Sequence, residues 1–222
     1  MVIHMQPEPD LYYRHAKQEN LILVGPEQNT YKNSWLRQQI SIFQMLKWRF
    51  LILDLSAEMG QPHLLGEEWT SIERRAIENI RNPIVRIVSV SRLIDTLDEI
   101  SMVMEMSKTP FVVLIHMGNH VLNKDNAKCI EEKIRRLLSY KTGVWLVAPS
   151  LETFSLSLTA RFFQTHVVLN QFDVDDDLFK SWNKAVKLDP IENDLDETEA
   201  IFVFNGRSEG AKGQVFVSSI DE

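Results

Sequence analysis

Short runs of apolar residues recur along the chain, and each predicts a strand. The runs are rich in valine, isoleucine and leucine and do not alternate with polar positions. Continuous runs of this kind are typical of strands covered on both faces, as in a mainly parallel sheet. The six predicted strands span residues 20–25, 50–55, 84–89, 110–117, 143–150 and 165–171.

Between these runs, apolar residues recur every three or four positions, which predicts amphipathic helices. The three clearest faces are Leu36, Ile40, Phe43 and Leu46; Leu93, Leu97, Ile100 and Met104; and Ile130, Ile134, Leu137 and Leu138. Asn33-Ser34 and Asp125-Asn126 are the predicted N-caps of the first and third helix. Strands that alternate with helices predict right-handed βαβ crossovers, and therefore an α/β three-layer sandwich with a mainly parallel sheet.

The two ends of the chain differ from this pattern. Residues 1–18 are interpreted as a linker that enters a single domain spanning 19–222. Within that domain, residues 200–222 hold two β runs around a glycine-rich turn, which predicts a hairpin at the sheet edge. The segment 172–199 has no strand signal, although Leu178, Phe179, Trp182 and Val186 fit a short helix.

Negative charge is concentrated in the segment 172–199. It holds ten Asp and Glu residues against three Lys, so its net charge of −7 equals that of the whole chain. This balance argues against nucleic acid as a partner. We interpret the segment as a solvated surface, with a docking surface for a basic partner as the alternative. The single cysteine, Cys129, predicts a structural thiol without a disulfide, and no apolar run has the length of a membrane span.

The stretch "LILVGPEQNTYKNSWLRQQI", residues 21–40, has the outline of a phosphate-binding loop. Such a loop needs G-x-x-x-x-G-K-[ST], whose backbone N–H groups and lysine hold phosphates while the hydroxyl binds Mg²⁺. Counted from Gly25, the second glycine is Thr30, the lysine is Tyr31 and the hydroxyl residue is Lys32. A one-residue insertion brings Lys32 into place but puts Tyr31 at the glycine and Asn33 at the hydroxyl residue. The sequence therefore predicts a vestigial nucleotide loop.

The strand that should bring Mg²⁺ to this loop has also lost its ligands. Phosphoryl-transfer enzymes place an Asp at the end of a buried strand, followed by a Glu that orients water. In "FVVLIHMGN" these positions hold His116 and Met117. Neutral imidazole is a poor Mg²⁺ ligand and methionine is none, so no Mg²⁺ or ATP is expected as a cofactor. We predict a pseudo-ATPase rather than an enzyme.

The order of these stretches resembles the FtsK/SpoIIIE-type motor ATPases. The matching stretches are "LILVGPEQNTYKNSWLRQQI", "RFLILDLSAEMG" with Asp54 at the same sheet edge, "PFVVLIHMGNHVLN", "IEEKIRRLLSYKTGVWLVAPS" and "LTARFFQTHVVLN". The resemblance covers about residues 10–170 and implies a RecA-like P-loop NTPase fold. This chain keeps the order of strands and helices of that family but lacks its catalytic residues. In this it is similar to the degenerate C-terminal ATPase domain of type VII secretion coupling proteins, EssC and EccC.

That resemblance implies a module for substrate recognition or for regulation of neighbouring ATPase domains. The implied partners are secreted WXG-type proteins, the neighbouring ATPase domains of the same chain and further copies in a hexamer, without nucleic acid. The implied location is the cytoplasmic side of the membrane, as part of a membrane-anchored protein. Two alternatives stay open: an active NTPase that uses Lys32 and Asp54 in an unorthodox arrangement, and a regulator that binds ATP without hydrolysing it.

Other candidate sites have simpler interpretations. His116 and His120 are four apart, but Gly118 between them argues against a shared helix face, and no cysteine or carboxylate cluster completes a metal site. Asp54 is expected to cap the turn that follows its strand. Trp69 and Trp182 lie outside the strongest periodic segments and are the predicted anchors for a partner protein, if they are exposed.

Overall fold

The strands of this protein form one sheet. The computed structural model describes residues 20–26, 30–45, 49–56, 68–69, 84–106, 112–118, 122–140, 143–163, 165–169, 176–186, 195, 199–204 and 211–214. The predicted linker 1–18, and most of the acidic segment outside its helix, lie outside these ranges.

The described strands are β1 (Leu21–Val24), β2 (Phe50–Asp54), β3 (Glu68–Trp69), β4 (Ile84–Arg86), β5 (Val112–His116), β6 (Gly143–Ala148), β7 (Thr165–Leu169), β8 (Glu199–Phe204) and β9 (Ala211–Gln214). In the sheet they are ordered β3-β4-β2-β5-β6-β1-β7-β8-β9. All neighbours from β3 to β7 pair in parallel, whereas β8 is antiparallel to both β7 and β9. All six predicted strands are therefore confirmed, as is the hairpin at the edge.

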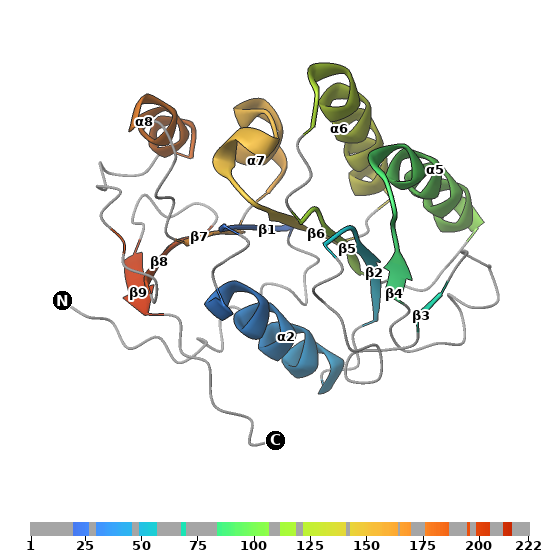
Figure 1. The fold of residues 1–222 in the computed structure, drawn as a ribbon, viewed down its shortest axis with the longest axis horizontal. Coiled ribbons are helices and arrows are strands. Elements are labelled where there is room, and N and C mark those ends of the chain that lie inside the picture. The colour runs from blue at the N-terminus through green and yellow to red at the C-terminus, as the bar shows by residue number, and fades with distance from the viewer. Residues whose placement is uncertain are drawn as a thin grey trace.

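Helices cover both faces of the sheet, which confirms the three-layer sandwich (Figure 1). Among the described helices, α2 (Thr30–Met45) is the one on the first face. The opposite face carries α5 (Val90–Met106), α6 (Lys124–Ser139), α7 (Leu156–Phe162) and α8 (Asp176–Ala185) (Figure 1). A short 3₁₀ turn, η1 (Leu151–Thr153), joins β6 to α7. None of the described helices is long and apolar enough to span a bilayer.

Two hydrophobic cores lie on the two faces of the sheet, because successive strand residues point to opposite sides. In β5, Val112 and Leu114 pack in the core beneath α2, whereas Val113 and Ile115 pack in the core beneath α5–α8. The same alternation points the side chain of the next residue, His116, toward α2.

Two helix starts differ from the sequence prediction. Helix α2 begins at Thr30, so Asn33-Ser34 lies within its first turns and is not the cap. The N-cap of α6 is Asn123, whose side chain accepts a hydrogen bond from the Asn126 N–H at 2.8 Å. Asn123 takes this role because its backbone is extended while the residues after it are already helical. Helix α7 was not predicted; its seven residues are too few to show a helical period.

Candidate functional site

The candidate residues lie at one edge of the sheet, where the parallel strands β1, β2 and β5 end. Helix α2 starts at the same edge, because Lys32 and Asn33 in its first turn contact Gly25 after β1 and His116 at the end of β5. In open α/β sheets, ligands bind outside the carboxyl ends of the strands. This edge is therefore where a ligand would bind, and four polar residues lie there on the α2 side: Lys32, Asn33, Asp54 and His116.

Lys32 reaches back from α2 to the end of β1. Its side chain is only 1% exposed, and its Nζ donates to the backbone carbonyl oxygen of Gly25 at 3.2 Å. Lys32 is the third residue of α2, in the turn whose N–H groups have no partner within the helix. The ammonium and the positive end of the helix dipole thus lie together, which favours an anion. Lys32 comes one position after the lysine of the phosphate-loop pattern, yet its side chain links the end of β1 to the first turn of α2.

Gly25 is needed for close packing at the end of β1. A Cβ atom here would lie 2.8 Å from Leu169 Cδ1 of the neighbouring strand β7. Its N–H continues the pairing with β6 by donating to the Ala148 carbonyl oxygen at 3.1 Å. Thr30 and Tyr31, which stand at the glycine positions of the two loop alignments, form the first helical residues of α2; their side chains are outside the described set.

His116 is completely buried and joins β5 to α2. Its Nε2 lies 3.1 Å from Asn33 Oδ1, and the Gly118 N–H donates to its Nδ1 at 3.3 Å. A backbone N–H can only donate, so Nδ1 carries no proton, and in the neutral ring Nε2–H donates to Asn33. Burial lowers the pKa of His116 to about 3, helped by the positive charges of Lys32 and Arg37. The imidazole is therefore neutral at physiological pH.

Asp54 caps the turn after β2, as predicted. Its Oδ1 accepts from the Ser56 backbone N–H at 2.9 Å and from the Ser56 hydroxyl at 2.6 Å. The same oxygen lies 3.9 Å from His116 Nδ1. That contact is neither a hydrogen bond nor an ion pair, because the distance is too long and the ring is neutral. Asp54 nevertheless brings a buried carboxylate to the α2 side of the site.

Met117 faces away from the site. Its side chain is fully buried in the core beneath α5–α8, and its N–H donates to the Val147 carbonyl oxygen at 2.9 Å. A residue in this orientation cannot orient water next to Lys32. The predicted loss of the water-orienting carboxylate at this position therefore has a packing reason, since the position belongs to the core.

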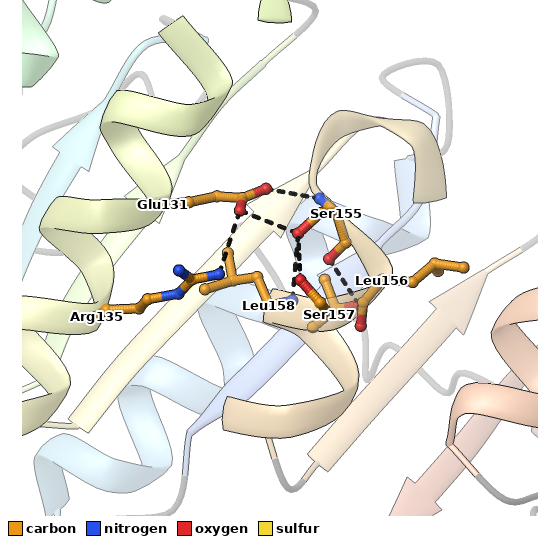
Figure 2. A network of polar contacts seen from close by, with 7 residues as sticks. Glu131, Arg135, Ser155, Leu156, Ser157 and Leu158 are labelled. Atoms are coloured by element: carbon orange, nitrogen blue, oxygen red, sulfur yellow. Dashed lines mark hydrogen bonds and ion pairs between the residues drawn. The ribbon is translucent and has the colours of Figure 1, made fainter. Parts of the chain in front are cut away.

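The segment after β6 is fixed at the same edge by a polar network (Figure 2). Glu131 on α6 accepts from the Ser155 N–H at 2.8 Å and from its hydroxyl at 2.9 Å, and Arg135 lies 3.6 Å from the carboxylate. Ser155 is in turn the N-cap of α7, accepting from the Leu158 N–H. The network holds the beginning of α7 against α6. Sequence reasoning missed it because Glu131 and Ser155 are 24 residues apart.

The prediction that Trp182 anchors a partner protein is wrong, because it required an exposed side chain. Its side chain is 0% exposed and packs against Phe179 and His166 in the core beneath α8. A short amphipathic helix outside the strong periodic segments still buries its largest side chain. Trp69 lies in β3, and its side chain is outside the described set. His120 also lies outside the described residues. Those residues contain no group of three His, Cys, Asp or Glu that could hold a metal ion.

No protein-family model and no curated protein sequence matches this chain. Solved structures match its fold. The DNA-packaging ATPase B204 of Sulfolobus turreted icosahedral virus has a TM-score of 0.65 and 10% identity over 89% of this chain and 97% of its own. The genome-packaging NTPase B204 of Sulfolobus turreted icosahedral virus 2 matches with ATPγS bound (TM-score 0.63, 11% identity, 89% and 97% covered) and with AMPPCP bound (0.63, 11%, 89% and 98%).

These neighbours correct one prediction and confirm another. The chain has the α/β RecA-like P-loop NTPase fold that the sequence resemblance implied. The prediction of a pseudo-ATPase is contradicted, because the neighbours that share this fold over nearly their whole length are an ATPase and an NTPase, and the NTPase has been captured with ATP analogues. The prediction was based on the positions of motif residues along the sequence. In the folded chain, the Lys32 side chain reaches the end of β1.

Proposed function

We propose that this chain is a P-loop NTPase domain that binds a nucleoside triphosphate at the carboxyl edge of the sheet. The observation that carries the proposal is the contact from Lys32 Nζ to the Gly25 carbonyl oxygen. A lysine in this place links the end of β1 to the first turn of α2, and the N-terminus of a helix is where the phosphates of a nucleotide bind. The bound ATP analogues of the packaging NTPases with this fold support the assignment.

Lys32 brings a positive charge to the start of α2. Its ammonium group is 1% exposed and has exchanged hydration for contacts within the protein, among them the Gly25 carbonyl oxygen. A phosphate bound at the start of α2 would add a favourable charge interaction with this ammonium. The helix N-terminus next to Lys32 would contribute in the same direction.

For hydrolysis, we assign the role of orienting water to Asp54. It is the carboxylate that the described structure brings to the α2 side of this edge, next to His116. The water oxygen would form a bond to the γ-phosphorus while the bond to the bridging oxygen breaks. The water proton passes to the Asp54 carboxylate, and Lys32 stabilises the negative charge on the departing diphosphate.

We further propose that nucleotide turnover moves a polymer, by analogy with the packaging motors of the same fold. The net charge of −7 favours protein over nucleic acid as that polymer. The secreted WXG-type proteins, the neighbouring ATPase domains, the hexamer and the membrane-associated location stay predictions from the sequence resemblance. Stimulation of phosphate release by a WXG-type protein, and not by duplex DNA, would support the protein alternative; the reverse result would overturn it.

Calorimetric titration with ATPγS tests the nucleotide site. We expect saturable binding that is weakened at least tenfold in Lys32→Ala, because the buried ammonium contacts the phosphates. The matched control is Lys184→Ala, which removes an exposed lysine on α8 and should bind like the native chain. Phosphate release should fall in Asp54→Asn with little change in ATPγS affinity. Absence of binding, or equal affinity in Lys32→Ala, would contradict the proposal.

A further inference from the structure

The residues at the metal position of this fold do not fit a Mg²⁺ ion. Magnesium takes oxygen ligands with lone pairs directed at the ion from about 2.1 Å. Here the hydroxyl residue is replaced by Asn33 and the carboxylate by His116, and these two side chains bind each other at 3.1 Å. Asn33 Oδ1 receives the proton of Nε2, and the lone pair of Nδ1 receives the Gly118 N–H. Neither ring nitrogen has a lone pair left for a metal.

Asp54 does not repair this set. Its carboxylate lies on the Nδ1 side of the imidazole, 3.9 Å away, whereas Asn33 lies on the Nε2 side. A single ion cannot contact both residues across the ring. In addition, Asp54 Oδ1 already accepts two hydrogen bonds from Ser56. Asp54 and the hydrogen-bonded Asn33–His116 pair therefore do not converge on one point.

Positive charge is present at this edge without a metal. Lys32 and Arg37 both lie on α2, close enough to His116 to act electrostatically on its ring. A strand carboxylate at position 116 would need a cation between itself and the phosphates, since the two anions repel. With a neutral imidazole there, that repulsion is absent. Because His116 replaces the carboxylate, no divalent ion is needed to screen that residue from the phosphates.

We propose that this site binds nucleoside triphosphates without a divalent cation, with the neutral Asn33–His116 pair in the place of the metal ligands. The inference rests on the proposed function and concerns the same site. Magnesium reduces the negative charge of a free nucleotide. A site without ligands for Mg²⁺ does not bind the Mg²⁺ complex more tightly through the ion. The lower charge of that complex also weakens its attraction to Lys32. Affinity for ATPγS in a chelator should exceed the affinity in Mg²⁺ or lie within about threefold of it.

Titration of the native chain with ATPγS, in EDTA and in excess Mg²⁺, tests the inference. A dissociation constant in EDTA no more than threefold above that in Mg²⁺ supports it, and a larger ratio overturns it. Absence of binding in both buffers removes the proposed function, and this inference with it. The two failures are thus distinguishable, because binding only in Mg²⁺ would keep the proposed function and sink the metal-independent site.

A double variant identifies the residues responsible. Asn33→Ser with His116→Asp restores a hydroxyl and a carboxylate at the two positions. We expect this variant to bind ATPγS at least tenfold more weakly in EDTA than in Mg²⁺, since the new carboxylate repels phosphate unless a cation lies between them. Thermal unfolding of the variant shows whether it is folded. If the folded double variant remains indifferent to Mg²⁺, the pair is not the cause and the assignment is wrong.

Discussion

His116 Nε2 donates a hydrogen bond to Asn33 Oδ1 over 3.1 Å, although 83 residues separate the two in sequence. The bond joins the end of β5 to the first turns of α2. Counted along the chain, these positions are two separate losses from two separate motifs. In the folded protein they form one pair, with the Gly118 N–H fixing the tautomer that allows it. A substitution at either residue therefore acts on both elements.

Replacing His116 with alanine should destabilise the fold substantially. The substitution leaves a cavity in a fully buried position and removes the partner of Asn33 and of the Gly118 N–H. We expect a loss of about 2–4 kcal/mol in the free energy of unfolding, which urea denaturation would measure. Lys184→Ala, on the exposed face of α8, is the control and should change stability by less than about 0.5 kcal/mol. A loss below about 1 kcal/mol for His116→Ala would contradict the pairing.

The glycines at the ends of β1 and β5 should differ in their tolerance of a side chain. Gly118 has φ of +56°, and a Cβ would lie 2.7 Å from Ser56 Cα, which is backbone and cannot move alone. At Gly25 the nearest atom is the Cδ1 of Leu169, at the flexible end of a side chain. We expect Gly118→Ala to cost about 3 kcal/mol and Gly25→Ala about 1 kcal/mol. Chemical denaturation of both variants tests the order; equal losses would show that backbone strain at Gly118 is unimportant.

Strands and helices were predictable because burial on both faces requires continuous apolar runs. In β1, four consecutive apolar residues are buried, with alternate side chains in the two cores. A parallel sheet covered by helices leaves this signal in the sequence directly. The two-residue strand β3 and the seven-residue helix α7 leave none, since neither completes a period of its pattern.

The site was less predictable, because its contacts depend on depth and register. The positions of Gly25, Lys32 and His116 at one sheet edge followed from the order of elements. The contact from Lys32 to Gly25 did not, since a long side chain can reach the end of β1 from a position that is one residue later in the sequence. Trp182 was misjudged for a similar reason. The sequence around a short helix does not show which face of that helix packs against the core. Spatial pairs such as Asn33 with His116 have no signal in a single sequence.

The contact between Glu131 and Ser155 should show strong coupling. Figure 2 shows the carboxylate receiving both the N–H and the hydroxyl of Ser155, so one residue caps α7 while bound to α6. Since Glu131 is nearly buried, removal of one partner leaves polar groups unpaired. We expect Glu131→Ala to cost about 2 kcal/mol and a double-mutant cycle with Ser155→Ala to give a coupling energy of about 1–2 kcal/mol. Additive losses in the cycle would contradict a stabilising bond from the Ser155 hydroxyl, since the backbone N–H bond to Glu131 survives in Ser155→Ala.

Stability should decrease as the pH falls below about 6.5, and His166 should account for part of the decrease. His166 is buried beside Trp182, and its Nε2 donates to the Phe163 carbonyl oxygen at 3.0 Å. Burial lowers the pKa of His166 to about 4, against the smaller opposing effect of that carbonyl. Between pH 6.5 and 4 the unfolded chain therefore binds a proton at this residue that the folded chain does not. By linkage, the free energy of unfolding falls with falling pH in this window, by up to about 1.4 kcal/mol per unit.

His116 contributes a decrease of the same sign, since its pKa is also lowered, to about 3. The variant His166→Gln separates the two, because glutamine can donate to Phe163 and does not titrate. Urea denaturation at pH 6.0, 5.5 and 5.0 should give a slope of stability against pH that is smaller in this variant by about 1 kcal/mol per unit. Carboxylates titrate equally in both proteins and cancel in the comparison. Equal slopes would mean that His166 is protonated within the folded protein, so that Trp182 and α8 must move to admit the charge.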